Sequence, residues 1–378
     1  MKKVLLFINS LRGGSVGRMA VDFANELANY CEVTVQTLSD EGAFKKELND
    51  SVIYKSIVPN KAFKKIRKYF IAVIMPPSLV HDMYIGNQYD YEIAFGEGVP
   101  TKIIGASSNK NSIKYAWIHS NFGKNTLNGP KSEFKQSDVF SSLYKEIRCY
   151  ENFNKIICAS KSSKENFLNR YQIEDYSEDN LIVKHCFIDT NSLLEKAEEE
   201  FPRTGRFRIV TVGRLEKQKG HERLLWVIKK LVNEGIDCEL IIVGEGKRHD
   251  ELEGYIKYNG LKKRVLMTGF SDNPYKYIKS ADLCVFPVKN DSYGTAAVES
   301  VILGKPVIIS DCKGVRDLLG DSEYGVISDN SDHGLYECIK KMITDDEYRM
   351  HYEEKAKERA KYFSKDARLK DLSDLFEF

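Results

Sequence analysis

The second half of the chain alternates short apolar runs with helical segments, and this alternation restricts the fold more than any other feature. The apolar runs occupy residues 207–212, 238–243, 264–268, 282–286, 306–310 and 325–327. Between them lie amphipathic segments such as 221–235, where leucine, isoleucine and valine share one helical face and Gly235 ends the pattern. Apolar strands that alternate with amphipathic helices predict a parallel sheet covered on both faces.

The first half repeats this scheme, and 378 residues are enough for two hydrophobic cores, so two α/β domains are expected. The charged stretch 189–206 is interpreted as the linker between them, and the chain ends in a charged helical tail. Strands are predicted at 3–8, 31–37, 52–58, 90–95, 113–118, 155–159 and 180–185, and helices at 16–29, 62–75, 137–150 and 161–171.

Composition excludes several classes of protein. A formal net charge of +2 is too small for the strongly basic face of a nucleic-acid binder. The eight cysteines form no Cys-x-x-Cys pair, which indicates reduced thiols in the cytoplasm. The opening run 1–10 is interpreted as a buried strand rather than a signal peptide, and no run is long enough to span a membrane. No Asp-x-Asp occurs and the seven histidines show no close ligand spacing, so we expect neither a metal site nor a cofactor.

Ligands of open α/β sheets bind beyond the carboxyl ends of the strands. The first cluster of candidate residues at such a position is basic. Gly213 ends a predicted strand, and Arg214 and Lys219 flank the start of the next helix. A guanidinium, an ammonium and the free N–H groups of a helix terminus suit a diphosphate. The alternative for such a cluster is a solvated basic turn that binds no ligand.

A second cluster follows the strand 282–286. Asp291 and Glu299 are carboxylates separated by seven residues, and Gly294 between them permits close backbone approach at the start of a helix. Carboxylates there could accept hydrogen bonds from sugar hydroxyls. The alternative is structural, with Asp291 capping the helix and Glu299 paired with a lysine.

A third cluster belongs to the first half. Gly13 and Gly14 follow the first strand, in a phosphate-compatible turn that lacks the dinucleotide-binding fingerprint. His119 closes the run 113–118 at another carboxyl end. A lone histidine is more often a packed or surface residue than a catalyst, in about two cases out of three.

Together these residues resemble the retaining glycosyltransferases of the GT-B fold, in the group 1 family of bacterial polysaccharide and glycolipid enzymes. The segments that carry the resemblance are 212–220, 241–246, 265–270 and 286–311, most specifically through their order and spacing. The resemblance implies two Rossmann-like domains that face each other across a cleft. It makes 1–188 an acceptor-binding domain, joined by the terminal helix at about 362–378, and 189–361 a domain that binds the nucleotide sugar.

The resemblance also implies roles for single residues. Arg214 and Lys219 would bind the donor diphosphate and stabilise it as it leaves, next to Gly213. Asp291 would hold the transferred sugar and Glu299 the ribose hydroxyls. The remaining positions are implied as donor contacts: Gly14 toward the phosphates, His119 by the donor sugar, Phe270 by the base, and the backbone at Tyr293, Gly294 and Thr295.

Two departures from the family pattern affect this assignment. The first acidic position is usually Glu and is here Asp291, which is shorter by one methylene. The turn between the domains usually has Asn before its Val/Ile-Asp element, whereas this chain has 185–189, His-Cys-Phe-Ile-Asp.

Three functions therefore compete. The leading one is metal-independent transfer of a hexosyl or N-acetylhexosaminyl group, with retention, from a nucleoside diphosphate donor to a lipid-linked saccharide. UDP is favoured because many relatives use it, with GDP and ADP left open. The others are a nucleotide-sugar epimerase, for which further acid/base carboxylates are missing, and a catalytically silent binding partner.

The segment 61–75 predicts a membrane partner. On a helix its apolar side chains, including Ile66, Tyr69 and Phe70, share one side, and five basic side chains share the other. Such a basic amphipathic helix with aromatic anchors is typical of a segment that lies on an anionic membrane surface, here the inner face of the cell membrane. The alternative is a helix packed in the core with a solvated basic face.

Overall fold

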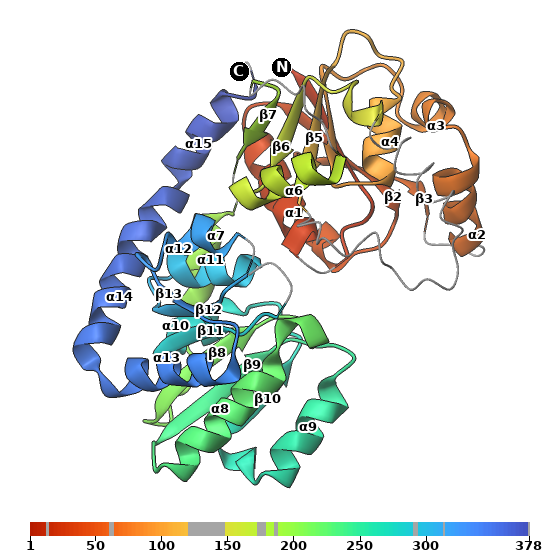
Figure 1. Cartoon of the computed structure of the whole chain (residues 1–378). Helices are drawn as coiled ribbons and strands as arrows, with labels where there is room; N and C mark the ends of the chain where they lie inside the picture. Colours follow the sequence, from red (N-terminus) through yellow and green to blue (C-terminus); the bar gives the residue numbers. More distant parts are fainter. Residues whose placement is uncertain are drawn as a thin grey trace. The chain divides into compact units, whose positions relative to one another are not determined.

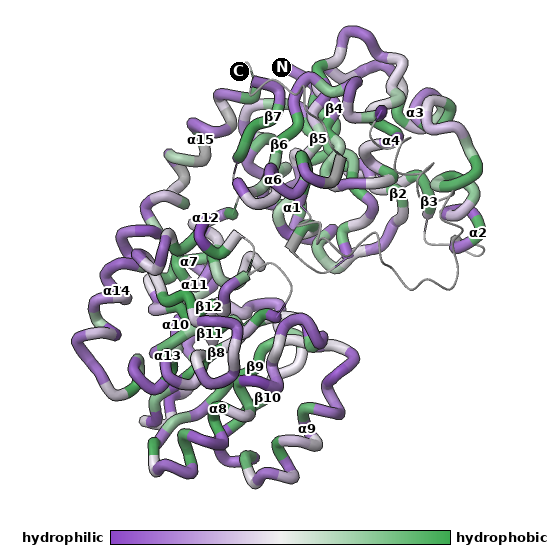
Figure 2. The backbone as a smooth tube through the Cα atoms, in the orientation of Figure 1, coloured by the Kyte–Doolittle hydropathy of each residue, from purple (hydrophilic) through white to green (hydrophobic). Residues whose placement is uncertain are grey.

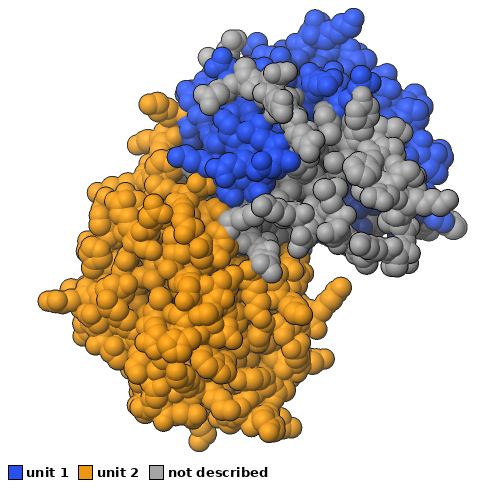
Figure 3. All heavy atoms as spheres, viewed as in Figure 1, with its two compact units in different colours: residues 1–189, 371–378 blue, residues 190–370 orange. Residues whose placement is uncertain are grey.

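The computed structural model describes residues 1–12, 15–59, 64–119, 148–171, 179–184, 188–289, 294–312 and 314–376. The chain forms two compact units (Figure 3). Unit 1 comprises residues 1–189 and 371–378, and unit 2 comprises residues 190–370.

Unit 1 is built on a seven-stranded parallel sheet in the order β3-β2-β1-β4-β5-β6-β7 (Figure 1). Its strands are β1 (Lys3–Ile8), β2 (Glu32–Ser39), β3 (Ile53–Val58), β4 (Tyr91–Phe95), β5 (Ile113–Ile118), β6 (Lys155–Cys158) and β7 (Leu181–Val183). Its helices are α1 (Ser15–Leu27), α2 (Lys64–Tyr69), α3 (Pro77–Tyr84), α4 (Val99–Gly105) and α6 (Lys161–Tyr171), with a π-helical turn at Phe70–Ile74.

Unit 2 carries a six-stranded parallel sheet in the order β10-β9-β8-β11-β12-β13. Its strands are β8 (Phe207–Val212), β9 (Cys238–Val243), β10 (Val265–Gly269), β11 (Leu283–Phe286), β12 (Val307–Ser310) and β13 (Val326–Ser328). Its helices are α7 (Thr190–Ala197), α8 (His221–Asn233), α9 (His249–Tyr258), α10 (Tyr275–Ser280), α11 (Thr295–Ile302), α12 (Val315–Leu319), α13 (Asp332–Thr344) and α14 (Asp346–Ala360), followed by α15 (Lys365–Ser373).

The two sheets share one strand order, and burial explains why the sequence encodes it so plainly. All six residues of β9 are buried, as are all but the first of β1, because helices cover both faces of each sheet. In each unit the order reverses beside the first strand, between β1 and β4 and between β8 and β11. Such switch points are where α/β sheets bind ligands. The predicted α/β fold with two Rossmann-like domains is confirmed.

The end of the chain returns to unit 1. The Phe376 ring is 2% exposed and lies 5.0 Å from the Tyr91 ring and 5.9 Å from the Tyr115 ring. The Tyr115 hydroxyl donates to the Leu375 carbonyl at 2.6 Å, and Lys184 forms an ion pair with Asp374 at 2.8 Å. The segment that belongs to unit 1 starts at 371, later than the predicted start of the terminal helix at about 362.

The interpretation of 189–206 as a linker is wrong over its first half. α7 buries Leu193 and Ala197 and packs against α10. The Asn273 amide donates to the Lys196 carbonyl at 2.7 Å, which fixes the end of the helix. The charges of this segment obscured a narrow apolar stripe. The seven cysteines among the described residues are free thiols.

Candidate functional site

The loops at the carboxyl edge of the unit 2 sheet are packed backbone to backbone. A Cβ added to Gly244, after β9, would lie 2.1 Å from the carbonyl oxygen of Gly213, after β8. The Gly244 N–H donates to the Gly269 carbonyl at the end of β10, at 2.9 Å. Only glycine allows this approach, so the ends of three neighbouring strands form one rigid rim.

Lys219 lies on this rim at the switch point. The next residue, Gly220, has φ of 70°, and a Cβ there would lie 2.1 Å from the Pro287 carbonyl oxygen, just beyond β11. This contact presses the loop after β8 against the loop after β11. The Lys219 ammonium nitrogen is 3.8 Å from the position that a Cβ of Gly294 would occupy. Lys219 is therefore beside the N-terminus of α11, and the first two sequence clusters meet.

The N-terminus of α11 adds its own positive potential to that of Lys219. Gly294 precedes the helix with φ of 80° and ψ of 168°, and Thr295 is its first residue. The free N–H groups of a first helical turn attract anions. Glu299, one turn later on the same helix, is buried, with 7% of its surface exposed.

Arg214 is held only loosely. Its side chain is 61% exposed, and its Nη1 pairs with Oε1 of Glu216 at 2.7 Å. Because exposed ion pairs of this kind contribute little energy, an anionic ligand can compete for the guanidinium. Phe270, directly after β10, is 53% exposed, and Gly213 directly follows β8. All of these residues share the carboxyl edge of unit 2.

Arg223 is a structural residue of this site that the sequence analysis missed. It is 2% exposed, and its Nε donates to Asp332 Oδ1 at 2.7 Å. Its Nη1 donates to the Pro287 carbonyl at 3.2 Å, to Ser310 Oγ at 3.1 Å and to Asn330 Oδ1 at 2.8 Å. One guanidinium thus joins the ends of β11 and β12 to the start of α13, behind Gly220.

A second brace holds the start of the loop that leads from β11 to α11. Glu222 accepts hydrogen bonds from Lys289 at 2.8 Å and from Arg248 at 2.6 Å. Burial raises the pKa of Glu222, but these two cations outweigh burial and leave that pKa below its usual value. The Lys289 N–H also donates to the Gln218 carbonyl at 2.9 Å. The rim is therefore both ionic and preorganised.

His119 lies at the carboxyl edge of the unit 1 sheet, in aromatic surroundings. Its ring centroid is 4.5 Å from that of Phe95 and 6.5 Å from that of Trp117, and its backbone N–H donates to Glu97 Oε1 at 2.7 Å. Both ring nitrogens are buried, and neither has a hydrogen-bond partner within the described parts of the chain. Burial lowers the pKa of His119 to about 3, so the imidazole is neutral at physiological pH. Gly14, Asp291 and Tyr293 lie outside the described residues.

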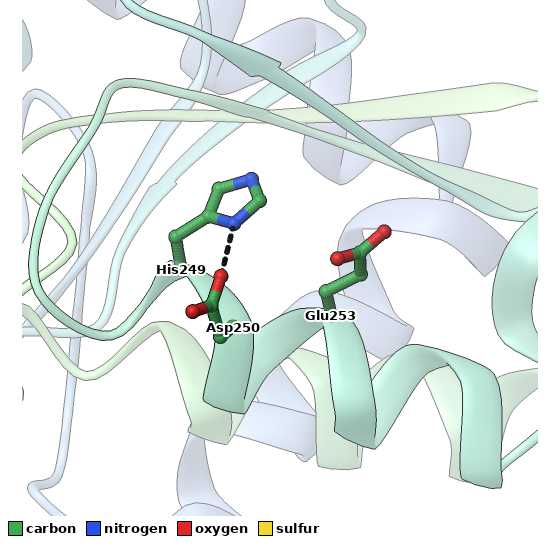
Figure 4. A group of neighbouring side chains, drawn as sticks. All are labelled: His249, Asp250 and Glu253. Carbon is green, nitrogen blue, oxygen red and sulfur yellow. Dashed lines mark hydrogen bonds and ion pairs between the residues drawn. The ribbon is translucent and has the colours of Figure 1, made fainter.

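Among the described residues, one group of side chains brings its ligand atoms close enough together to hold a metal ion. His249, Asp250 and Glu253 on α9 bring their ligand atoms within 4.8 Å of one another (Figure 4). The i, i+4 spacing of His249 and Glu253 on one helix was the overlooked signal. The Asp250 side chain is fully exposed and bonds to His249 Nδ1 at 3.1 Å. The positive end of α9 opposes a cation there.

None of the helices in the described segments is long and apolar enough to cross a membrane.

Comparison with known proteins finds one family model that matches part of the chain. Residues 194–359 match the model of the glycosyl transferases group 1. A relative in Campylobacter jejuni, N-acetylgalactosamine-N,N'-diacetylbacillosaminyl-diphospho-undecaprenol 4-alpha-N-acetylgalactosaminyltransferase, is 33% identical over 57% of this chain and 58% of its own length. The alpha-D-kanosaminyltransferase of Streptomyces kanamyceticus is 28% identical over 37% of this chain and 36% of its own length. The matches thus span about three fifths or less of these curated relatives.

The fold also matches solved structures. The crystal structure of Anabaena Alr3699/HepE in complex with UDP superposes with a TM-score of 0.76, at 19% identity, over 99% of both chains. Likeness at this identity shows the fold.

Proposed function

We propose that this chain, which carries a group 1 glycosyltransferase domain over residues 194–359, moves a sugar from a nucleoside diphosphate donor to a saccharide acceptor. The observation that carries the proposal is the position of the Lys219 ammonium beside the N-terminus of α11, at the switch point of the unit 2 sheet. A UDP donor is supported by the solved relative that binds UDP.

The chemistry that this arrangement suits is departure of a diphosphate. Breaking the bond between the anomeric carbon and the phosphate oxygen leaves negative charge on the diphosphate. Lys219, Arg214 and the N–H groups of α11 would stabilise that charge, and the preorganised rim spares them reorganisation during the reaction. We propose that this set replaces a divalent cation, so that transfer is metal-independent.

The remaining candidate residues would contact uncharged parts of the donor or offer it backbone N–H groups. Glu299 would accept hydrogen bonds from the ribose hydroxyls, and Asp291 from the transferred sugar. Phe270 would contact the base, and Gly14, Tyr293 and Thr295 would offer backbone N–H groups. His119, which is neutral, would hydrogen-bond a sugar hydroxyl and carry no charge to the diphosphate. Retention of the anomeric configuration is proposed from the family resemblance, for a hexosyl or N-acetylhexosaminyl group.

The acceptor that we propose is a lipid-linked saccharide, such as a polyprenyl-diphosphate carrier in the synthesis of a bacterial polysaccharide or glycoconjugate. It is supported by the name of the Campylobacter jejuni relative, which specifies a diphospho-undecaprenol acceptor. Because such an acceptor is embedded in a membrane, the enzyme would act at the cytoplasmic face of that membrane.

Incubation with a panel of UDP-sugars, with and without a polyprenyl-diphosphate saccharide, tests the proposal. We expect UDP release that depends on acceptor, with an α-linked product identified by NMR. A β-linked product would overturn retention. Conversion of the free donor would instead indicate an epimerase, and UDP-sugar binding without turnover a silent partner.

A further inference from the structure

The segment from α2 to α3 exposes an unusual amount of apolar surface. Among the described residues, seventeen large hydrophobic side chains are exposed, and seven of them lie between residues 66 and 83. Figure 2 shows hydrophobic residues at the outer margin of unit 1 between the labels α2 and α3. We call this surface the α2–α3 face and define it by Ile66, Tyr69, Phe70, Val73, Ile74 and Met83, which are 50–66% exposed.

The exposure of this segment argues against its interpretation as a helix packed in the core. A helix packed in the core would bury its apolar side, yet Ile66 and Val73 are 66% and 63% exposed. Only Ile71 of the π-helical turn is buried, at 5%. The predicted single helix 62–75 is also interrupted, because α2 ends at Tyr69 and a π-helical turn follows it before Pro76. The turn ends with the Met75 N–H bonded to the Phe70 carbonyl at 2.9 Å.

The face is firmly attached to unit 1 from beneath. Val80 and His81 of α3 are fully buried, and His81 Nε2 lies 3.2 Å from Oε2 of the buried Glu92 on β4. The apolar side chains are therefore presented outward by an anchored scaffold, rather than left over from a poorly packed segment.

Basic side chains accompany the apolar ones. Lys65 and Arg67 are exposed and Lys68 is half-buried, all on α2. The only acidic residue between 64 and 84 is Asp82. A hydrogen bond from Ser108 at 2.7 Å, and a second one from His81, hold the pKa of Asp82 below its usual value. The face thus combines aromatic and aliphatic side chains with a net positive charge.

We propose that the α2–α3 face docks on an anionic lipid bilayer, with the apolar side chains in the interfacial layer and the basic ones among the headgroups. Tyr69 and Phe70 supply the aromatic anchors that this layer favours. A second copy of the chain fits less well, because a two-fold contact on this face would bring the same basic residues together. This inference rests on the proposed function, because membrane docking would give the enzyme access to a lipid-linked acceptor.

Sedimentation with vesicles tests the docking without any sugar transfer. The wild-type chain is expected to sediment with phosphatidylglycerol vesicles at low salt, and to be released by high salt or by neutral phosphatidylcholine. Lys65→Glu, Arg67→Glu and Lys68→Glu together should lower the vesicle partition coefficient by about a hundredfold, since each basic side chain contributes about fivefold. Ile66→Ser, Val73→Ser and Ile74→Ser should lower it by about tenfold or more.

A matched control alters similar residues on unit 2, with Lys262→Glu, Lys263→Glu, Tyr258→Ser and Leu266→Ser, all at exposed positions. This variant should bind vesicles as the wild type does. Equal binding by all variants, or a wild type that ignores anionic vesicles, overturns the docking. An apolar variant that turns a dimer into a monomer in light scattering, with vesicle binding unchanged, assigns the face to self-association instead.

Sugar transfer separates this inference from the proposed function. With a detergent-dispersed acceptor, the face variants should release UDP at the wild-type rate, whereas with acceptor in vesicles they should be slower. Vesicle binding without any UDP release would leave the docking intact and overturn the proposed function.

Discussion

The two sheets share a strand order but differ in the chemistry of their carboxyl edges. The unit 2 edge is ionic, with Lys219 beside a helix N-terminus and the buried Arg223 behind it. At the unit 1 edge, His119 lies against Phe95 and Trp117 with a pKa lowered to about 3, so its imidazole carries no charge. One topology thus carries a lysine beside a helix N-terminus on unit 2 and an uncharged imidazole among aromatic rings on unit 1. The chemistry resides in the loops and not in the fold.

The largest effect should come from the cations of the unit 2 edge. Arg214→Ala or Lys219→Ala should each lower UDP-sugar turnover by about a hundredfold or more, the scale on which a preorganised electrostatic stabiliser acts. Initial rates of UDP release would measure it. Lys217→Ala, an exposed lysine in the same loop, is the control and should change little. Full turnover in the double variant would mean that the diphosphate binds elsewhere.

Replacing Arg223, the buried arginine behind the unit 2 edge, should lower the stability of the fold. Arg223→Met removes hydrogen bonds to the carbonyl of Pro287 and the side chains of Ser310, Asn330 and Asp332, and should lower the free energy of unfolding by about 2–4 kcal/mol. Urea unfolding would measure it. Arg316→Met is the matched control, because Arg316 pairs with Asp311 at the exposed surface and should matter by less than about 1 kcal/mol. Equal losses in both variants would refute the distinction between a braced and a solvated arginine.

The fold could be predicted from sequence more fully than the site. Strands such as β1, β8 and β9 match their predicted bounds, because burial on both faces leaves continuous apolar runs. The sequence placed Lys219 and Gly294 each after a strand of the same sheet, and the structure brings them together because parallel strand ends share one edge. α7 was missed because its charges hide the burial of Leu193.

Arg223 illustrates what a single sequence does not contain. Within α8 it looks like a solvated helical position, yet its partners come from residues 64 to 109 positions later in the chain. Only the tertiary fold brings these oxygens around one guanidinium. The exposure of Ile66 and Val73 is a similar case, because an amphipathic pattern says that a face is apolar but not what covers it.

A smaller effect concerns the buried, uncharged imidazole of His119 at the unit 1 edge. The folded chain keeps the His119 pKa near 3, whereas the unfolded chain binds a proton near pH 6.5. Stability should therefore fall as pH drops below about 6.5, by up to about 1.4 kcal/mol per pH unit, and continue to fall down to about pH 3. Urea unfolding of the wild type and of His119→Asn at pH 7 and pH 5 would measure how much of the pH dependence of stability comes from His119.

His333→Asn, at a histidine whose side chain is 71% exposed, is the matched control substitution. A direct check is the NMR titration of the His119 ring, which should show no protonation between pH 5 and pH 8. A midpoint near 6.5 would mean that the His119 imidazole can carry a positive charge, and its contrast with Lys219 would disappear.

The smallest expected effect is that of metal removal, which should be none. If Lys219, Arg214 and the α11 terminus meet the charge of the leaving diphosphate, the rate of UDP release should be the same in EDTA as in added Mg²⁺ or Mn²⁺. If the rate falls in EDTA, the metal could act either at the exposed group on α9 or at the diphosphate, and a variant of the α9 group distinguishes the two. In His249→Gln with Glu253→Gln, a lost dependence on metal would assign the ion to the exposed group on α9. A strict requirement that survives in this variant would place the metal at the diphosphate itself, and the ionic edge of unit 2 would then be insufficient for catalysis.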